Sequence, residues 1–507
     1  MKRFIVILLC CLILCGCEQQ EIIEATQPII STTVNDDYIE ETTVTTESEQ
    51  TPTIETTVTT TPSQLVETKP IDNDEDTVNT EPTTTPTETE PVETTPPTVG
   101  TEPTTPPEKT VAELVADGTY MLSKSYDFYK GSMDMSAIHT ITFSSTHPSS
   151  YDERWNANVA DNDGIVGYRV GTDVIIVGEH IYANTNSKYM FAAQTSSGKS
   201  LWSSLVKIDG LELLRMSYVR DMSGLFLEGK FSSLSGIGSW SVGSVRNMSM
   251  VFSGCTNLTT LDVGSWNVSN VTDFSGIFQG NANAGNMKLQ YLDVGKWNTS
   301  SAINFSHMFY GCGALTHIPI ENWNVSRVAT FSHMFADCFS LQSIDISNWS
   351  TVSARSFNAM FNDCRSLTVI DVSGLETSSC TQFSQMFEAC TSLQKIIGLD
   401  RWNVTNASNY AFSETFHCCY SLRDINIGNW HTSPDNTARM FKNCYSLSSV
   451  DLSGFNMDNN HTVLEMFMNC TSLTEIKGME NWSLENAEGY DTMYVGTSFE
   501  NKGETNG

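Results

Sequence analysis

Eight cysteines that recur at regular spacing are the first residues of this 507-residue chain to suggest chemistry. Each follows an aromatic position by three residues, and they are Cys255, Cys312, Cys338, Cys364, Cys390, Cys419, Cys444 and Cys470. Thiols in such numbers could form disulfides in an exported protein or bind a metal ion. Cysteines stacked in register point side by side, however, which is a poor geometry for bridging, and no C-x-x-C pair occurs among them. We therefore predict small buried thiols that fill a turn, with Cys418-Cys419 as the exception to inspect.

Carboxylates and imidazoles also recur at fixed positions. An aspartate follows a Leu, Ile or Val in several units, at Asp262, Asp293, Asp345, Asp371 and Asp451. A calcium ladder is one interpretation, but each unit offers one carboxylate, without the glycine-aspartate spacing of calcium-binding β-rolls. We favour carboxylates that accept backbone N–H bonds or face solvent. His307 and His333 share one position in neighbouring units and could bind zinc or sense pH, but surface residues are the more ordinary interpretation.

Tryptophan closes most units, at Trp240, Trp266, Trp297, Trp323, Trp349, Trp402, Trp430 and Trp482. An exposed row of indoles would suit carbohydrate or peptide binding. Leu375 and Phe455 stand at this position in two other units. The position therefore keeps an apolar side chain but not the indole N–H and its hydrogen bond, and we predict that the column lies in the core. Asn-x-Ser/Thr triplets, such as Asn267-Val268-Ser269, match the glycosylation pattern but are better explained as turn residues.

Motifs of known enzymes were sought and not found. The sequence contains no nucleophile elbow, no H-E-x-x-H and no phosphate loop, and no Cys-His pair in a non-repeated context was recognised. We therefore predict a protein that is not an enzyme and that needs no cofactor. A glycan hydrolase with paired carboxylates is the enzymatic alternative, and it would require a deep cleft, most readily within residues 111–215.

The columns belong to an internal repeat. Phenylalanine recurs at 226, 252, 278, 309, 335, 361, 387, 416, 441 and 467, and Tyr494 continues the series, at steps of 25 to 31 residues. Each unit holds a Leu-x-x-Leu-x-Val pattern, as in Leu258, Leu261 and Val263, which is typical of a short strand with one inward face. We predict a β-rich, leucine-rich-repeat-like solenoid of about ten units over residues 216–500, with short parallel strands such as Thr259 to Val263, followed by a tail at 501–507.

Residues 111–215 precede the repeats and have a different pattern. Strand-like runs at 138–144, 174–177 and 181–183 alternate with turns such as Asp163-Gly164. We predict a small β-rich module that caps the first repeat. An independent binding domain is the alternative.

The N-terminus has the features of an export signal. Lys2 and Arg3 precede an apolar run over residues 4–13, which is too short to span a bilayer, so we predict a signal peptide over residues 1–16. The following Leu14-Cys15-Gly16-Cys17 resembles a bacterial lipobox. That resemblance implies that Cys17 receives a diacylglycerol and becomes the first residue after cleavage, which would anchor the protein stably to the membrane. An ordinary secretory signal is the alternative.

Residues 17–110 read as a tether. Within 18–110, threonine occupies 29 of 93 positions and proline 12, and 21 acidic residues face two lysines, a net charge of −19. Such a segment cannot bury enough apolar area to fold, so we predict a disordered spacer. The whole chain has a formal net charge of −32, which argues against nucleic acid as a partner.

The repeat consensus, Phe-x-Gly-Cys-x-x-Leu-x-x-Leu-Asp-Val-x-x-Trp-Asn-Val-Ser, resembles that of the BspA-like leucine-rich-repeat surface proteins. Links such as Phe305-Ser306-His307-Met308-Phe309, and the runs Asp163-Gly164-Ile165-Val166 and Ile208-Asp209-Gly210-Leu211, resemble other parts of that family. The resemblance covers about 111–500 and departs from the pattern at 281–288, where Asn281 replaces the cysteine. It implies a cell-surface adhesin for host matrix proteins or other cells, with no catalytic residues to transfer.

These inferences combine into one functional hypothesis. We predict a non-catalytic, adhesin-like protein held by the lipid on Cys17 at the outer face of a bacterial membrane, with a protein or glycan ligand on host or other cells. The alternative is a structural envelope protein that self-associates. The chain ends thirteen residues after Tyr494 without a recognisable polar capping unit, and an uncapped rung favours pairing with a second copy.

Overall fold

The computed structural model describes residues 109–280, 286–458, 460–484 and 487–500. The signal peptide, Cys17, residues 17–108 of the predicted tether and the tail at 501–507 lie outside the described residues. Among the residues that are described, no helix is long and apolar enough to cross a membrane.

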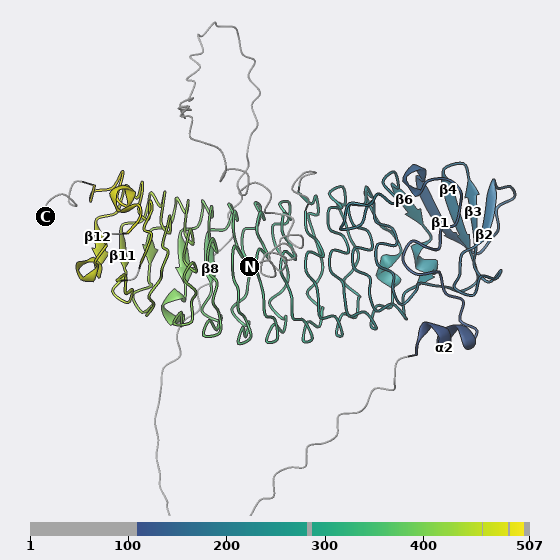
Figure 1. The fold of residues 1–507 in the computed structure, drawn as a ribbon, viewed down its shortest axis with the longest axis horizontal. Helices are drawn as coiled ribbons and strands as arrows, with labels where there is room; N and C mark the ends of the chain where they lie inside the picture. The colour runs from purple at the N-terminus through teal and green to yellow at the C-terminus, as the bar shows by residue number, and fades with distance from the viewer. Residues whose placement is uncertain (1–108, 281–285, 459, 485–486, 501–507) are drawn as a thin grey trace, which may run out of the picture. The chain divides into compact units, whose positions relative to one another are not determined.

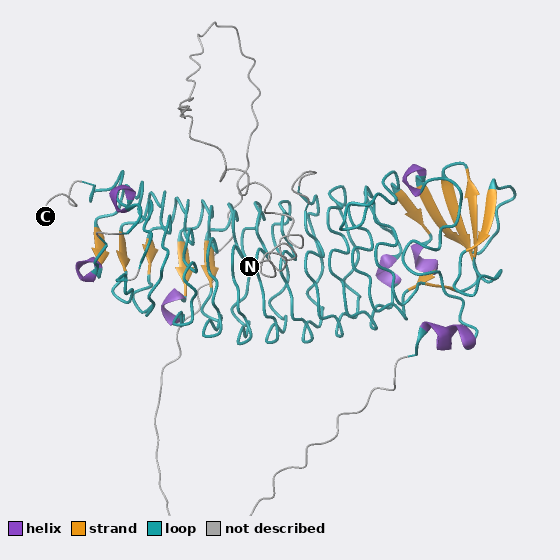
Figure 2. Ribbon diagram, in the orientation of Figure 1, coloured by secondary structure: helices purple, strands orange, loops and turns teal. Residues whose placement is uncertain are grey.

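The described chain begins with helix α2, Val111–Ala116, followed by a five-stranded sheet (Figure 2). Thr110 caps the helix in a capping box with Glu113. The sheet has the order β2-β3-β4-β1-β6, in which β2, β3 and β4 are antiparallel neighbours and β1 is parallel to β4 and β6. Its strands are β1 Thr140–Ser144, β2 Glu153–Asn156, β3 Val166–Val170, β4 Asp173–Val177 and β6 Lys207–Asp209.

The remaining elements are short. Parallel pairs are formed by β5 with β7 and by β8 with β9, and β10, β11 and β12 form a three-stranded parallel sheet. Their bounds are β5 Ile181–Tyr182, β7 Leu214–Arg215, β8 Val369–Asp371, β9 Lys395–Ile397, β10 Asp424–Ile425, β11 Ser449–Asp451 and β12 Glu475–Lys477. Single 3₁₀ turns are η2 Met135–Ala137, η3 Leu211–Leu213, η4 Ile237–Ser239, η5 Leu399–Arg401, η6 Met479–Asn481 and η7 Tyr490–Thr492.

The repeats stack as successive rungs (Figure 1), joined by a backbone ladder on the phenylalanine side. The N–H of each repeat phenylalanine donates to the carbonyl of the residue before the next aromatic of the series, at 2.9–3.1 Å, from Phe226 through to Phe467. Parallel bridges accompany this ladder without a break from Asn186 to Gln382. The ladder therefore begins inside the segment predicted as the cap.

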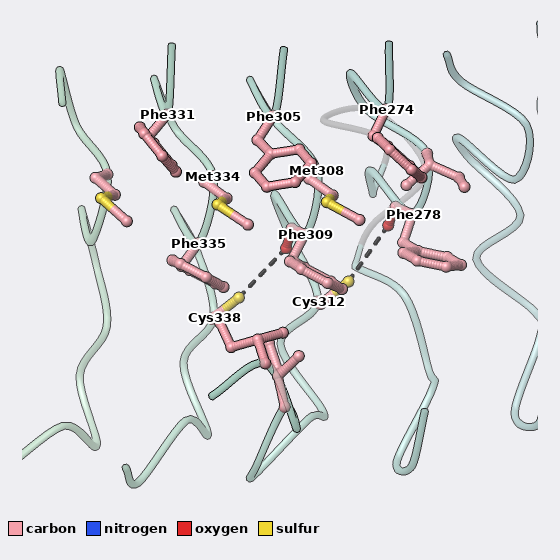
Figure 3. Close-up of a cluster of buried hydrophobic side chains, with 14 of the residues drawn as sticks. Phe274, Phe278, Phe305, Met308, Phe309, Cys312, Phe331, Met334, Phe335 and Cys338 are labelled. Carbon is pink, nitrogen blue, oxygen red and sulfur yellow. Dashed lines mark hydrogen bonds between the residues drawn. The ribbon is translucent and has the colours of Figure 1, made fainter. Parts of the chain in front are cut away.

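The phenylalanine rings form an unbroken stack along this ladder. Ring centroids lie 5.3–5.9 Å apart from Phe191 to Tyr494, with ring planes mostly near parallel. Each of the eight column cysteines donates its thiol to the phenylalanine carbonyl of the preceding unit, at 3.0–3.3 Å. Figure 3 shows two of these bonds, from Cys312 to Phe278 and from Cys338 to Phe309. The prediction of buried, unbridged thiols is confirmed, because all eight are free and buried.

The tryptophan column lies in the core, as predicted, except that Trp482 is half-buried and its indole N–H has no hydrogen-bond partner among the described residues. From Trp240 to Trp430 its members are buried, and each indole N–H donates to a backbone carbonyl of the preceding unit at 2.8–3.3 Å. Leu375 and Phe455 fill the same column and are also buried. The position therefore requires apolar volume, and the indole adds a bond between rungs.

The predicted strand from Thr259 to Val263 is wrong, since this segment is extended but unpaired. No strand is assigned among the described residues between β7 and β8, and pairing on this face resumes at β8. In the described part of the chain, no backbone hydrogen bond joins residues 259–263 to a neighbouring unit. The sequence pattern gives this segment an inward face, but a strand also needs backbone N–H and C=O groups of a neighbour within bonding distance.

Substitution of Trp349 by phenylalanine tests the bond between rungs. We expect the free energy of unfolding to fall by about 0.5–1.5 kcal/mol, because the Ile320 carbonyl loses the indole N–H at 3.2 Å and keeps the backbone N–H of Trp323 at 3.1 Å. Urea denaturation of the full chain measures this. Leu375→Met, at the same position of the next unit, is the control, since it has no side-chain bond to lose. Equal destabilisation by the two variants would show that the indole contributes volume alone.

Candidate ligand-binding site

The face on which strand pairing lapses carries a hollow. Side chains of these segments alternate between the core and solvent, so Leu234 and Val263 are buried whereas Ser233, Ser235 and Asp262 are exposed. Three consecutive rungs surround a hollow of about 500 Å³. Its polar lining is Ser233, Ser235, Thr260, Asp262, Tyr291 and Asp293. We call this hollow the Tyr291 groove.

Tyr291 and two carboxylates dominate the chemistry of the groove. Tyr291 is 71% exposed, the highest exposed fraction among the large hydrophobic side chains at the described surface. Asp262 and Asp293 form no ion pair with any residue that the structure describes. An aromatic face beside unpaired carboxylates is an arrangement that attracts cationic groups, through the ring quadrupole and through charge-assisted hydrogen bonds.

Glycines of the preceding unit hold these carboxylates in place. A Cβ atom at Gly238 would lie 2.2 Å from Asp262 Oδ2, and one at Gly264 would lie 3.0 Å from Asp293 Oδ2. Each carboxylate therefore packs directly against the backbone of the unit before it. A side chain at either glycine would push the carboxylate away from the groove.

The other column aspartates have the structural role that we predicted. Asp345, Asp371 and Asp451 each accept the backbone N–H of a serine two residues later, at 2.9–3.1 Å. The serine hydroxyls also bond to Asp345 and Asp451, and these bonds lower the pKa of both carboxyls. At the groove, glycine stands in place of that serine, in Asp262-Val263-Gly264 and Asp293-Val294-Gly295. The change from Asp-x-Ser to Asp-x-Gly is the sequence signal that distinguishes the groove and that the analysis of the column missed.

The repeats match a known family model. The model is described as "Mycoplasma protein of unknown function, DUF285", and it matches residues 185–291, 281–402 and 394–506. The chain belongs to this family. The match begins next to Asn186, where the bridge ladder starts, so the DUF285 repeats and the ladder cover the same part of the chain. No functionally curated protein matches the chain.

Three of the solved structures with similarity to this chain are bacterial leucine-rich-repeat proteins. One from Bacteroides ovatus is 17% identical and covers 58% of this chain and 84% of its own, with a TM-score of 0.28. A leucine-rich cell-surface protein from Faecalibacterium prausnitzii is 16% identical, with coverages of 71% and 91% and a TM-score of 0.32. One from Eubacterium ventriosum is 15% identical, with coverages of 68% and 95% and a TM-score of 0.29.

The family match and the stacked rungs confirm the predicted BspA-like character and the predicted class of β-rich, leucine-rich-repeat-like solenoid. The Asn-x-Ser/Thr triplets of the DUF285 repeats form turns, as expected. The side-chain oxygens of Asn267 and Asn324 accept the backbone N–H groups of Ser269 and Ser326, at 3.2 and 3.1 Å.

His307 and His333 are not simple surface residues, so the prediction made for this pair is wrong. The rings of His307 and His333 stack at 4.7 Å with planes 5° apart, and both are half-buried. The reason is backbone geometry: both residues are left-handed, with φ of 57° and 56°, which turns the side chains along the column toward each other. The ring atom Nδ1 of His333 is buried without a hydrogen-bond partner in the described structure.

The described part of the chain contains no cluster of metal-binding side chains. No group of three or more histidines, cysteines or acidic residues is placed to hold an ion there. Burial raises the pKa of Cys255 and of Cys380 to about 12, so these thiols stay protonated at neutral pH.

The stacked histidines predict a loss of stability in acid. Burial and, secondarily, the charge of His333 lower the pKa of His307 to about 4, below the unfolded value of about 6.5. The unfolded chain therefore binds more protons between these values, so the stabilisation is complete above pH 6.5 and is lost as the pH falls toward 4. We expect the free energy of unfolding to fall by about 3 kcal/mol between pH 6.5 and pH 4, measured by urea denaturation across this range.

His307→Asn should flatten this part of the pH profile, since asparagine tolerates the left-handed conformation and does not titrate. His431→Asn, at an exposed histidine, is the matched control and should leave the profile unchanged. Identical profiles for His307→Asn and the wild type would contradict the assignment.

Proposed function

We propose that this protein is a non-catalytic, adhesin-like binding protein of the bacterial cell surface, and that the Tyr291 groove contacts its ligand. The observation that carries the proposal is the groove itself. An exposed aromatic ring stands there beside two unpaired carboxylates, on a frame whose core positions are filled by stacked rings. A rigid frame with a few exposed, unsatisfied groups is the usual form of a binding surface.

The ligand that best fits this chemistry is a protein with a basic segment. An arginine or lysine side chain would lie over the Tyr291 ring and pair with Asp262 or Asp293. The composition supports this choice, because residues 111–507 contain 38 acidic and 23 basic residues, a net charge of −15. Host matrix proteins and proteins of other cells are the sources that we consider.

The groove is smaller than a full protein interface, which buries roughly 800 Å² per partner. Further contact area is available on the same face of later rungs. Val369 on β8 and Ile397 on β9 are exposed apolar residues at the positions that correspond to Tyr291 and Asp293. We propose that the ligand lies across several rungs, with the Tyr291 groove as its anchoring point.

We propose that the protein is presented at the outer face of the membrane by a lipid on Cys17, with residues 18–110 as a spacer. The lipobox-like Leu14-Cys15-Gly16-Cys17 and the acidic, threonine- and proline-rich composition support this arrangement. One of the similar solved structures is itself described as a cell-surface protein.

Self-association through the last repeat is the alternative function. The described C-terminal rung is less open than the sequence suggested. Phe499 is buried, and its ring packs on that of Tyr494 at 6.1 Å, which covers the end of the aromatic stack. Ser498 also bonds to the Leu473 carbonyl of the preceding unit at 2.7 Å. These contacts lead us to treat self-association as an outcome of the binding experiment.

The test is binding of the full chain to a panel of extracellular-matrix proteins, glycans and itself, with and without calcium. We expect saturable binding to a matrix protein, weakened by salt, and weakened at least tenfold by Tyr291→Ala or by Asp262→Asn with Asp293→Asn. Tyr410→Ala is the matched control, since Tyr410 is 62% exposed and lies outside the groove. Binding that is indifferent to the groove substitutions, or binding to glycans alone, would overturn the proposal. A concentration-dependent oligomer without another ligand would establish the alternative.

A further inference from the structure

Cys418 differs from every other described cysteine in its position. It is half-buried, whereas the remaining nine described cysteines are buried. It stands two residues after Phe416, a left-handed position where other units place Gly311, Asp337, Asp363 or Asn443. Its neighbour Cys419 is the column cysteine and points inward to the Phe387 carbonyl. Cys418 is thus the described thiol that solvent can reach.

Polar side chains from three consecutive units surround the Cys418 sulfur. From the following unit, Asn443 Nδ2 donates to Sγ at 3.4 Å. From the same unit, the side chains of His417 and Tyr420 interact electrostatically with the thiol. From the preceding unit, Glu388 Oε1 accepts from His417 Nδ1 at 3.0 Å.

Outer contacts orient the two groups that matter most. Asn469 Nδ2 donates to Asn443 Oδ1 at 2.9 Å, so the amide of Asn443 turns its own N–H toward the sulfur. Asn362 Nδ2 donates to the second carboxylate oxygen of Glu388 at 2.9 Å, which leaves Oε1 facing His417. Hydrogen bonds between rungs therefore flank Cys418 on two sides: Asn362 and His417 both bond to Glu388 on one side, and Asn443 bonds to Cys418 and Asn469 on the other.

The electrostatics of this cluster favour a thiolate beside an imidazolium. Burial opposes the charge on Cys418, but hydrogen bonds from His417 and Asn443 outweigh it, and the pKa of the thiol falls below its usual value. Burial likewise opposes the charge on His417, but hydrogen bonds to Cys418 and Glu388 raise its pKa to about 9. Lys442 of the following unit accepts the Cys418 backbone N–H with its carbonyl at 2.8 Å, and its ammonium group is paired with Glu465.

We propose that Cys418 is a covalent attachment site that takes disulfide compounds by thiol–disulfide exchange. The Cys418 sulfur attacks one sulfur of a disulfide R–S–S–R, and a new bond forms between Sγ and S–R. The electron pair of the broken S–S bond leaves with the other sulfur as R–S⁻, which takes a proton from solvent. The disulfide itself is the oxidant, so the step needs no further reagent.

The product is a stable mixed disulfide, because the other nine described cysteines are buried and are not placed to act as a resolving thiol. Cys419 is the nearest in sequence, but its thiol is buried and bonded to a carbonyl, and burial raises its pKa well above the usual value. The site therefore fits attachment of a small or protein-borne thiol and not a turnover cycle.

The first experiment uses the aryl disulfide dithionitrobenzoate on the full chain at pH 7, with the labelled cysteine located by peptide mass spectrometry. We expect Cys418 to react at least a hundredfold faster than Cys255 or Cys380. His417→Gln should slow the labelling of Cys418 about tenfold at pH 7. Above pH 9.5 the labelling rate should be unchanged, because the Cys418 thiol is then ionised in the wild type and in the variant alike. Glu388→Gln should change the rate in the same direction by a smaller factor.

Glu414→Gln is the matched control. The Glu414 side chain is 21% exposed against 19% for Glu388, and it pairs with Arg439 and not with the cluster. Cys418 in this variant should be labelled at the same rate as in the wild type. The proposal would be overturned if Cys418 were not labelled at pH 7. It would also be overturned if the labelling rate rose only near pH 9 and were the same in His417→Gln as in the wild type.

A second experiment distinguishes the sources of the disulfide. The full chain is incubated with cystine or with a protein that carries an exposed disulfide, and adducts are detected by mass and by gel mobility without reductant. An adduct with cystine supports a small-molecule cap, an adduct with the protein supports covalent capture of a partner, and Cys418→Ser should abolish either one. Absence of both adducts, despite labelling by the aryl disulfide, would show that the site does not take natural disulfides.

Discussion

The hydrogen bond from each repeat phenylalanine to the unit that follows it is the interaction on which the rest of the structure depends. It sets the separation of successive rungs, and the rings stack because the backbone brings them to 5.3–5.9 Å. Each unit also contains buried backbone carbonyls that need hydrogen-bond donors from a neighbouring unit. Cysteine thiols take the phenylalanine carbonyls, and indole N–H groups take carbonyls on the tryptophan side. The polar demands of one unit are thus met by its neighbour, which makes the array cooperative.

This frame has a cost in backbone conformation. Many units hold two residues in the left-handed region, two positions before and two positions after the phenylalanine, and most of these are not glycine. Each such residue costs of order 1 kcal/mol, which the bonds and stacked rings on either side offset. The conformation also directs side chains along the column, from one unit to the next. His307 and His333 stack for this reason, and Cys418 meets Asn443 at the equivalent position of the following unit.

Sequence periodicity predicted what is decided within one unit. The buried cysteines, the buried tryptophans and their apolar replacements at Leu375 and Phe455 follow from the residue type at each position. It failed where the outcome depends on contacts between units. Thr259 to Val263 has a strand pattern, but no backbone hydrogen bond joins this segment to the described residues of a neighbouring unit. The stacked histidines and the environment of Cys418 likewise involve two or three units, and no single unit displays them.

The functional candidates lie where a column departs from its own rule. Along the aspartate column, glycine in place of serine leaves Asp262 and Asp293 without the bonds that occupy Asp345 and Asp451. Along the left-handed position, cysteine in place of glycine, aspartate or asparagine puts a thiol among polar groups. Core positions cannot vary in this way without loss of the ladder, whereas outward positions can, because only neighbouring units contact them. A repeat array therefore separates the residues that stabilise it from those that are free to bind, and the exceptions to the consensus are where binding chemistry should be sought.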